Sequence, residues 1–157
     1  ASYLKLGKDE GRLVVDKMPY NLKSLRLSLN ATENLVPNGN WRSVGFSHNA
    51  FYLESFIDEI SEAVGSNPID FRIKLLNGKP DHINVLIELA RKTEWDENSL
   101  IASNGLRRGR GIAFVEAFSS IIAQMVQVTV SSDNFLMYLI VSYHHLKMMS
   151  YHLLLYQ

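Results

Sequence analysis

The chain lacks cysteine and a net charge, and each absence removes a class of function. Without cysteine, the 157 residues hold no disulfide, thiolate metal site, iron–sulfur ligand or cysteine nucleophile. Sixteen Lys and Arg balance sixteen Asp and Glu, so no net field attracts a phosphate backbone or anionic lipid. The neutral charge therefore argues against nucleic-acid binding. A hydrophobic content of 46% and a charged content of 20% are typical of one globular domain.

The chain also lacks a long apolar run and a recognisable leader. Its longest unbroken apolar run near the end covers residues 135–141, far short of the roughly 20 residues that cross a bilayer. No membrane span is predicted. Residues 1–5 include no initiator Met, basic region or apolar region, so we expect the chain to be a fragment of a longer protein. The compartment stays open between cytoplasm and periplasm.

The hydrophobic periodicity predicts strands, then three helices, then strands. Residues 12–15 and 22–29 favour strands, and residues 112–130 are β-branched and aromatic enough for strands too. Helices are predicted from about residue 49 to 64, from 68 to 76 and from 80 to 95. Because the helices are clustered and do not alternate with strands, the predicted class is α+β. The apolar stripes of the first and third helices consist of Leu53, Phe56, Ile57, Ile60, Ala63 and Val64, and of Ile83, Leu86, Ile87 and Ala90.

Capping residues mark the ends of these helices. Ser47 or Asn49 is expected to cap the first helix, and Gly65 fits the left-handed position after it. In the second helix, Asn67 is the expected N-cap and Pro68 the first helical residue, with Asp70 favoured by the helix dipole. The pair Asn77-Gly78 ends that helix, and Pro80 starts the third.

Three clusters of polar residues invite functional interpretations, and each has a simpler one. The spacing of the histidines does not suit a metal site on a helix or a strand, and no metal ligands are predicted. The acids of the first helix lie opposite its apolar stripe, which predicts a solvated face. The arginines before residue 112 are expected at a solvated loop tip. These clusters are His144, His145 and His152; Glu54, Asp58, Glu59 and Glu62; and Arg107, Arg108 and Arg110.

The loop over residues 36–47 is the remaining candidate for chemistry, because the sequence has no P-loop, dinucleotide fingerprint or serine-hydrolase elbow. It places Arg42 beside Trp41 and between Gly39 and Gly45, just before a helix start whose free N–H groups favour an anion. This arrangement suits an anionic cofactor. The alternative is that Trp41 packs in the core, Arg42 lies on the surface and the glycines only form turns.

Several motifs of this sequence, in order, resemble the molybdopterin-binding large subunit of isoquinoline 1-oxidoreductase and related aldehyde dehydrogenases, in the xanthine oxidase family. The resemblance covers approximately residues 15–133, which would be part of a molybdopterin-binding domain. The matching motifs are Met18-Pro19-Tyr20-Asn21, Val36-Pro37-Asn38-Gly39-Asn40-Trp41-Arg42-Ser43-Val44-Gly45, Asn49-Ala50-Phe51, Asn67-Pro68-Ile69-Asp70-Phe71-Arg72, Gly109-Arg110-Gly111-Ile112-Ala113, Glu116-Ala117-Phe118 and Ala123-Gln124.

The resemblance implies a site built from two segments. Trp41, Arg42, Ser43 and Gly45 would contact the molybdenum cofactor, with the arginine beside the metal's oxo group. Val44 would face the substrate, and its position is aromatic in xanthine-oxidising relatives, so purine specificity is not expected. Phe118, together with Ser119, would line the same site from a second loop.

The implied reaction is hydroxylation of an aldehyde or N-heterocycle with oxygen from water, with molybdopterin as the cofactor. Electrons would leave through iron–sulfur clusters on a small [2Fe-2S] partner subunit. The family's general-base glutamate lies further towards the C-terminus and Glu116 does not match it. No catalytic residue is therefore expected within this chain, which would need the remainder of the large subunit and would be inactive alone.

Residues 134–157 form an atypical apolar tail that matches nothing in the family pattern. Between residues 135 and 157 there is no Gly, Pro, Asp or Glu, and an out-of-frame origin is one explanation of this abrupt change. An alternative from another functional class stays open. The chain would then be a non-catalytic α+β interaction module that retains the family scaffold.

Overall fold

A computed structural model describes residues 18–24, 42–43, 45–95, 107–130, 136–145 and 153–156. Within these ranges three helices precede four strands, which confirms the α+β class. The helices are α2 (Phe46–Ala63), α3 (Pro68–Leu75) and α4 (Pro80–Thr93). The strands are β1 (Arg107–Ala117), β2 (Ser120–Val130), β3 (Leu136–His145) and β4 (Leu153–Tyr156). None of the helices in these ranges is long and apolar enough to cross a membrane.

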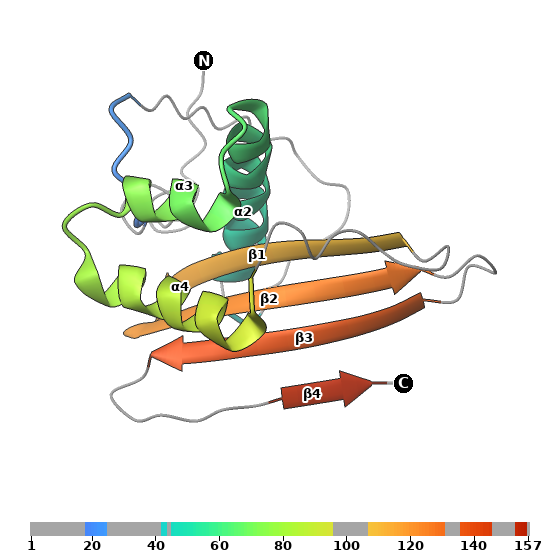
Figure 1. The fold of residues 1–157 in the computed structure, drawn as a ribbon. Helices are drawn as coiled ribbons and strands as arrows, with labels where there is room; N and C mark the ends of the chain where they lie inside the picture. The colour runs from blue at the N-terminus through green and yellow to red at the C-terminus, as the bar shows by residue number, and fades with distance from the viewer. Residues whose placement is uncertain are drawn as a thin grey trace, which may run out of the picture.

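The four strands form one antiparallel sheet in the order β1-β2-β3-β4. Each strand pairs with the one before it, so the sheet is a simple meander. Figure 1 shows the helices on one side of this sheet, with α4 crossing β2 and β3 and α2 standing beside β1. Strands β3 and β4 fall within the tail that matches no family motif, and they extend the sheet. The domain boundary at residue 133 stays a prediction.

The core lies between the helices and one face of β1 and β2. Alternate residues of these two strands are buried, with β1 against α2 and β2 against α4, as period-2 geometry requires. The predicted strands over residues 112–130 are confirmed, and β1 begins five residues earlier, at Arg107. The buried core residues are Tyr20, Ile57, Ile69, Leu76, Val85, Leu86, Leu89, Ile112, Phe114, Ile121, Ala123 and Met125.

The local capping signals of α3 and α4 are confirmed. The Asn67 Oδ1 atom accepts the backbone N–H groups of Ile69 and Asp70 at 2.9 and 3.4 Å. Pro68 occupies the first turn of α3, and Pro80 occupies that of α4. Gly65 follows α2 with φ of 62°, the left-handed conformation that favours glycine.

Four residues that periodicity places on the apolar stripes are exposed, namely Phe56, Ala63 and Val64 in α2 and Ile87 in α4. Phe56 and Val64 of α2 are 58% and 61% exposed, because the buried face of this helix is centred on Glu54, Ile57 and Ser61. In α4, Ile87 is 46% exposed, while Val85, Leu86, Leu89 and Thr93 are buried.

The strand prediction over residues 22–29 fails where it can be compared, because residues 22–24 are not in a strand. The rest of that stretch, and residues 12–15, lie outside the described residues. In β1, Arg107, Arg108 and Arg110 are strand residues and do not lie at a loop tip. Arg110 donates to the Gln127 side chain on β2 at 2.8 Å and to the Glu94 carbonyl at 3.2 Å.

Candidate functional site

A tight turn places Arg42 and Ser43 immediately before α2. Ser43 has φ of 80°, and its carbonyl accepts the N–H of Phe46 at 3.0 Å. Gly45 is buried, and its carbonyl accepts the N–H of Asn49 at 3.1 Å, which closes the first turn of the helix. Trp41 and Val44 lie outside the described residues.

The N-terminus of α2 has no side-chain cap, so the prediction of Ser47 or Asn49 as its cap is wrong. Gly45 occupies the N-cap position and offers no side-chain oxygen to the N–H groups of the first turn. The Asn49 Nδ2 atom is buried and has no hydrogen-bond partner within the described ranges. The start of α2 therefore presents donors to whatever group lies against it.

The hairpin between β1 and β2 carries Phe118 to the same place. Ala117 pairs with Ser120, which leaves Phe118 and Ser119 as a two-residue turn with φ of 50° and 61°. Phe118 is 70% exposed, and its ring centroid lies 5.0 Å from that of Phe46 in the first turn of α2. The two segments that the resemblance predicts as site-lining are thus neighbours, although more than 70 residues separate Arg42 from Phe118 in the sequence.

Backbone strain is concentrated at this place. Within the described residues, the non-glycine residues with positive φ are Ser43, Glu94, Phe118 and Ser119. Glu94 ends α4, whereas the other three belong to the two site segments. A left-handed non-glycine residue costs about 1–2 kcal/mol, and such strain clusters at functional sites. Asn-Gly is the usual choice for a two-residue turn of this kind, so the Phe-Ser pair carries a conformational cost that Asn-Gly would avoid.

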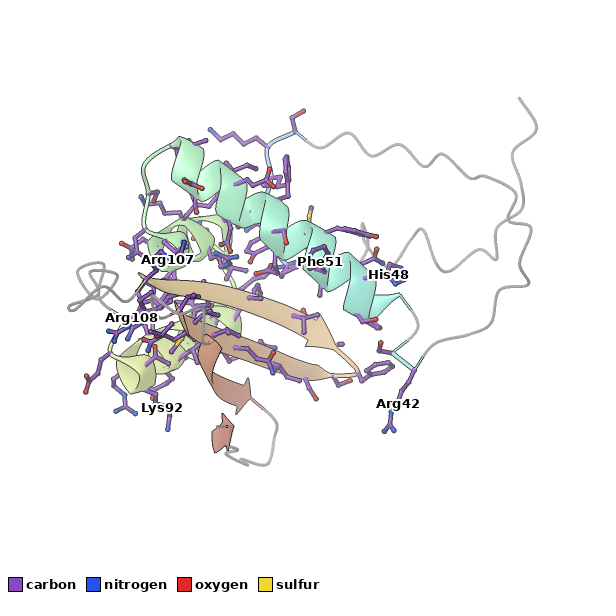
Figure 2. The ribbon with its side chains drawn as sticks, turned by 90° about the vertical axis from the view of Figure 1, so that its right-hand side faces the viewer. Arg42, His48, Phe51, Lys92, Arg107 and Arg108 are labelled. Atoms are coloured by element: carbon purple, nitrogen blue, oxygen red, sulfur yellow. The ribbon has the colours of Figure 1, made fainter. Side chains whose placement is uncertain are left out.

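Arg42 is exposed, and Figure 2 shows its side chain directed away from the helices and the sheet. Arg107, Arg108 and Lys92 lie at the opposite end of the molecule in that view. The positive charge at the start of α2 is thus separate from the arginines of β1.

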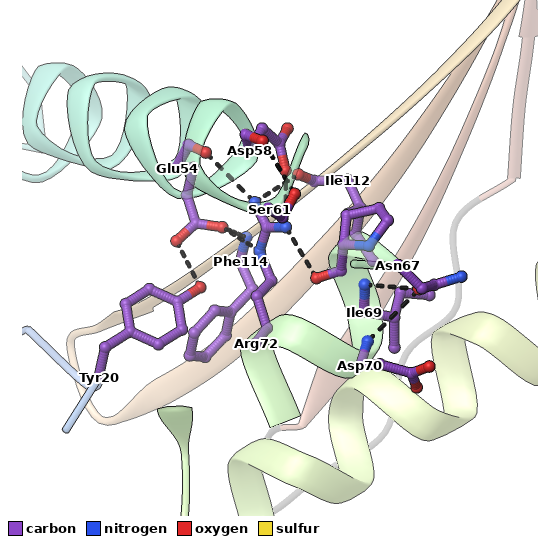
Figure 3. Close-up of polar contacts among 11 residues, drawn as sticks. Tyr20, Glu54, Asp58, Ser61, Asn67, Ile69, Asp70, Arg72, Ile112 and Phe114 are labelled. Carbon is purple, nitrogen blue, oxygen red and sulfur yellow. Dashed lines mark hydrogen bonds and ion pairs between the residues drawn. The ribbon is translucent and has the colours of Figure 1, made fainter. Parts of the chain in front are cut away.

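A second polar cluster is buried in the middle of α2, around Glu54 and Arg72 (Figure 3). Glu54 Oε1 accepts the Tyr20 hydroxyl at 2.7 Å. Glu54 Oε2 accepts the Nε of Arg72 at 3.0 Å and the backbone N–H of Phe114 at 2.9 Å. Three donors and no competing acceptor mark Glu54 as a carboxylate.

All three nitrogens of the Arg72 guanidinium have partners. In addition to Glu54, they contact the Asp58 carboxylate at 2.7 Å and the Pro68 carbonyl at 3.1 Å. The Nη2 atom donates to the carbonyls of Glu54 and Ile112 at 3.2 and 3.1 Å. The Arg72 side chain is fully buried, so these contacts replace the water that it loses.

This network closes the outer edge of β1. The Phe114 N–H and the Ile112 carbonyl point away from β2, where an edge strand would otherwise expose unpaired groups. Glu54 accepts the Phe114 N–H and Arg72 donates to the Ile112 carbonyl, as the backbone of a neighbouring strand would. The expectation of a solvated acidic face is therefore wrong for Glu54 and holds for the exposed Glu59 and Glu62.

The pKa shifts follow from burial and charge. Burial and the nearby Glu54 carboxylate raise the pKa of Tyr20 far above its ordinary value, so its hydroxyl stays a donor. Burial raises the pKa of Glu54, while Arg72 and the two other donors act in the opposite direction. Burial acts to lower the pKa of Arg72, but Glu54, Tyr20 and Asp58 carry it above its usual value. The network is saturated internally and offers no free group for chemistry.

Within the described ranges, no group of three or more His, Asp or Glu side chains could hold a metal ion. The backbone of His144 and His145 belongs to β3, and their side chains and His152 lie outside what the structure describes. An apolar cavity of about 230 Å³ lies between α2 and the strands β1 and β2. It is lined by Ala50, Ala113, Phe114, Val115, Ile122 and Gln124.

Comparison with known proteins gives two curated relatives. Over 106 residues, 65% of the chain, it is 30% identical to a nicotinate dehydrogenase subunit of Pseudomonas putida. Over 101 residues, 64% of the chain, it is 26% identical to the beta subunit of the isoquinoline 1-oxidoreductase of Brevundimonas diminuta. The aligned parts make up 9% and 13% of these relatives, so the chain matches about a tenth of their length.

No protein-family model matches the chain, and no solved structure matches it. The two relatives are named as subunits, one of a dehydrogenase and one of an oxidoreductase. Over about two thirds of its length, the chain is thus similar to short segments of subunits of two oxidoreductases.

Proposed function

We propose that this chain is a segment of the large subunit of a molybdenum hydroxylase that oxidises an aldehyde or an N-heterocycle with oxygen derived from water. The names of the relatives, a nicotinate dehydrogenase and an isoquinoline 1-oxidoreductase, favour an N-heterocycle. Electrons would pass to a small iron–sulfur subunit. The remainder of the large subunit would supply the general base and most of the cofactor contacts.

One observation carries this proposal: the Phe46–Phe118 contact, which brings the Arg42 turn and the Phe118 hairpin together. The resemblance assigns these two segments to one site, and nothing in their local sequence requires them to meet. Their strained backbones give independent support, because a phenylalanine at positive φ has a conformational cost and its largely exposed ring recovers little of that cost in packing.

The residues at the start of α2 fit an anionic cofactor such as molybdopterin. The uncapped helix N-terminus and the unpartnered Asn49 Nδ2 supply neutral donors, and Arg42 supplies a positive charge. Gly45 occupies the N-cap position, where it has no side-chain oxygen to occupy the donors of the first turn. When bound, the cofactor would supply the two-electron oxidation chemistry of the reaction.

The roles of this chain's own residues are binding and orientation. Arg42, Ser43 and Gly45, with Trp41, would hold the anionic group, and Arg42 would stabilise negative charge there. Phe118 and Val44 would face the substrate, and the Phe118 ring would stack on an aromatic heterocycle. No residue of the chain is assigned the transfer of a proton.

The test is Arg42→Ala in the complete gene product that contains this chain, expressed with its partner subunit. Molybdenum content, pterin fluorescence after oxidation and turnover of nicotinate, isoquinoline and an aromatic aldehyde would be measured. We expect turnover about 100-fold lower, the scale of losing one charge-stabilising group, with an unchanged melting temperature because Arg42 is exposed.

Arg107→Ala is the matched control, since Arg107 is another exposed arginine and lies at the far end of β1. It should leave turnover unchanged. Wild-type turnover and cofactor content in Arg42→Ala would refute the assignment of this turn to the cofactor.

A non-catalytic interaction module is the second candidate. Its support is an aromatic surface on α2, where Phe51, Tyr52 and Phe56 are 67%, 65% and 58% exposed. Exposed apolar surface of this kind marks contact with another protein. A folded, complete gene product that holds neither molybdenum nor pterin would favour the module over the enzyme.

A further inference from the structure

A polar pair joins α4 to β1 just before the turn that carries Phe118. His82 Nε2 lies 2.8 Å from Glu116 Oε2, so an N–H at this nitrogen donates to the carboxylate. Glu116 stands two residues before Phe118 and pairs with Ile121 across the hairpin. The pair is therefore placed at the base of the turn, on the side that faces α4.

His82 has little freedom to move. Its side chain is 13% exposed, and its ring meets the Phe114 ring edge-on, with centroids 5.8 Å apart and planes at 87°. The helix that carries it is anchored in the core by Val85, Leu86 and Leu89, each with no exposed surface. His82 is thus a fixed point to which Glu116 is attached.

The turn beyond Glu116 needs such a fixed point. Phe118 and Ser119 both have positive φ, a conformation that non-glycine residues keep only when the surrounding structure imposes it. The Phe118 ring touches Phe46 of α2, which holds it on one side. The bond between His82 and Glu116 holds the base of the same turn to α4.

We propose that His82 is a positioning residue for Phe118, acting through Glu116. The pair fixes the end of β1, and the end of β1 sets the direction in which the Phe118 ring is presented. This inference rests on the proposed function, in which Phe118 faces the substrate. His82 itself touches neither substrate nor cofactor.

The variants for the test are His82→Leu and His82→Gln in the complete gene product. Leucine fills the space but removes the donor, whereas the amide nitrogen of glutamine lies close to the position of Nε2 and keeps the bond to Glu116. Glu88→Gln is the matched control, because it breaks an exposed ion pair with Arg91 on the same helix. Melting temperature identifies any variant that fails to fold.

The kinetic readout separates binding from chemistry. We expect His82→Leu to raise KM about tenfold, equivalent to about 1.4 kcal/mol, with kcat within about twofold of wild type. His82→Gln should restore KM, and Glu88→Gln should not change it. In a double-mutant cycle, His82→Leu should add nothing to Phe118→Ala, since it acts through Phe118. Additive effects, or a His82→Gln variant as impaired as His82→Leu, would overturn the proposal.

A spectroscopic readout keeps this inference separate from the proposed function. A fluorinated phenylalanine at position 118 reports its ring environment by ¹⁹F NMR without any turnover. We expect the same resonance in wild type and His82→Gln, and a shifted or broadened one in His82→Leu. An unchanged resonance in His82→Leu overturns the positioning role. A changed resonance in a protein without activity supports the positioning role and counts against the proposed function.

Discussion

Two polar regions of one helix are built in opposite ways. In the middle of α2, Glu54 joins Arg72 and Tyr20 in a buried network in which every charge has partners inside the fold. At the start of the same helix, Arg42 is exposed, the first turn has no side-chain cap and the Asn49 amide is unpartnered among the described residues.

The contrast indicates which polar residues are available for function. Charges that satisfy one another and close the edge of β1 serve the fold, because removing them leaves buried groups without partners. Donors and charges without partners among the described residues, beside a largely exposed aromatic ring at positive φ, cost stability and recover little of it within the described part of the fold. Mutations in the two regions should therefore have opposite consequences.

The largest effect is expected from Glu54→Ala. It leaves the buried Arg72 guanidinium and the Phe114 N–H without their main acceptor, so the free energy of unfolding should fall by about 3–5 kcal/mol. Urea denaturation followed by circular dichroism measures this loss. Glu59→Ala, on the exposed side of the same helix, should change stability by less than about 0.5 kcal/mol. Equal effects of the two variants would remove the distinction between the buried network and an ordinary helix surface.

A smaller effect is expected from alkaline pH. The pKa of Tyr20 is raised in the folded state, so its contribution is fully present below the unfolded pKa of about 10 and is lost as pH rises beyond it. Stability should fall by about 1.4 kcal/mol per pH unit above pH 10 from this residue alone. Tyrosinate absorbance should show one tyrosine fewer titrating in the native state than in urea, and Tyr20→Phe should remove that difference. A native Tyr20 that titrates freely would show that the network is open to water.

Local signals in the sequence predicted much of the fold and little of these two regions. Asn67 and Pro68 were sufficient for the start of α3, because a cap depends on residues within one turn. Glu54 was assigned to a solvated face because it falls on the side of the helix opposite the predicted apolar stripe. Its partners Arg72 and Phe114 lie 18 and 60 residues away, and helical periodicity carries no information about such distant contacts.

The same reasoning applies to the candidate site. The Arg42 turn was singled out by its glycines and its place before a helix start, and Phe118 through the resemblance; their assignment to a cofactor and substrate stays a prediction. Their proximity through Phe46 is a tertiary fact with no local signal. The pair of His82 and Glu116 was missed for the same reason, since the two residues lie 34 positions apart. Asn49 was interpreted as a cap. Only the structure shows that its Nδ2 atom is buried and has no hydrogen-bond partner within the described ranges.

The smallest expected effect is a gain in stability, opposite in sign to the loss expected from Glu54→Ala. Replacing Phe118-Ser119 by Asn-Gly, the pair that a two-residue hairpin turn favours, should raise the free energy of unfolding by about 1–2 kcal/mol. The same change removes the ring proposed to face the substrate, so KM for an aromatic heterocycle should rise in the complete gene product. Urea denaturation and steady-state kinetics on one preparation measure both quantities. A lower free energy of unfolding together with a loss of activity would mean that Phe118 stabilises the fold, as Glu54 does. The buried network and the start of α2 would then not differ in their role.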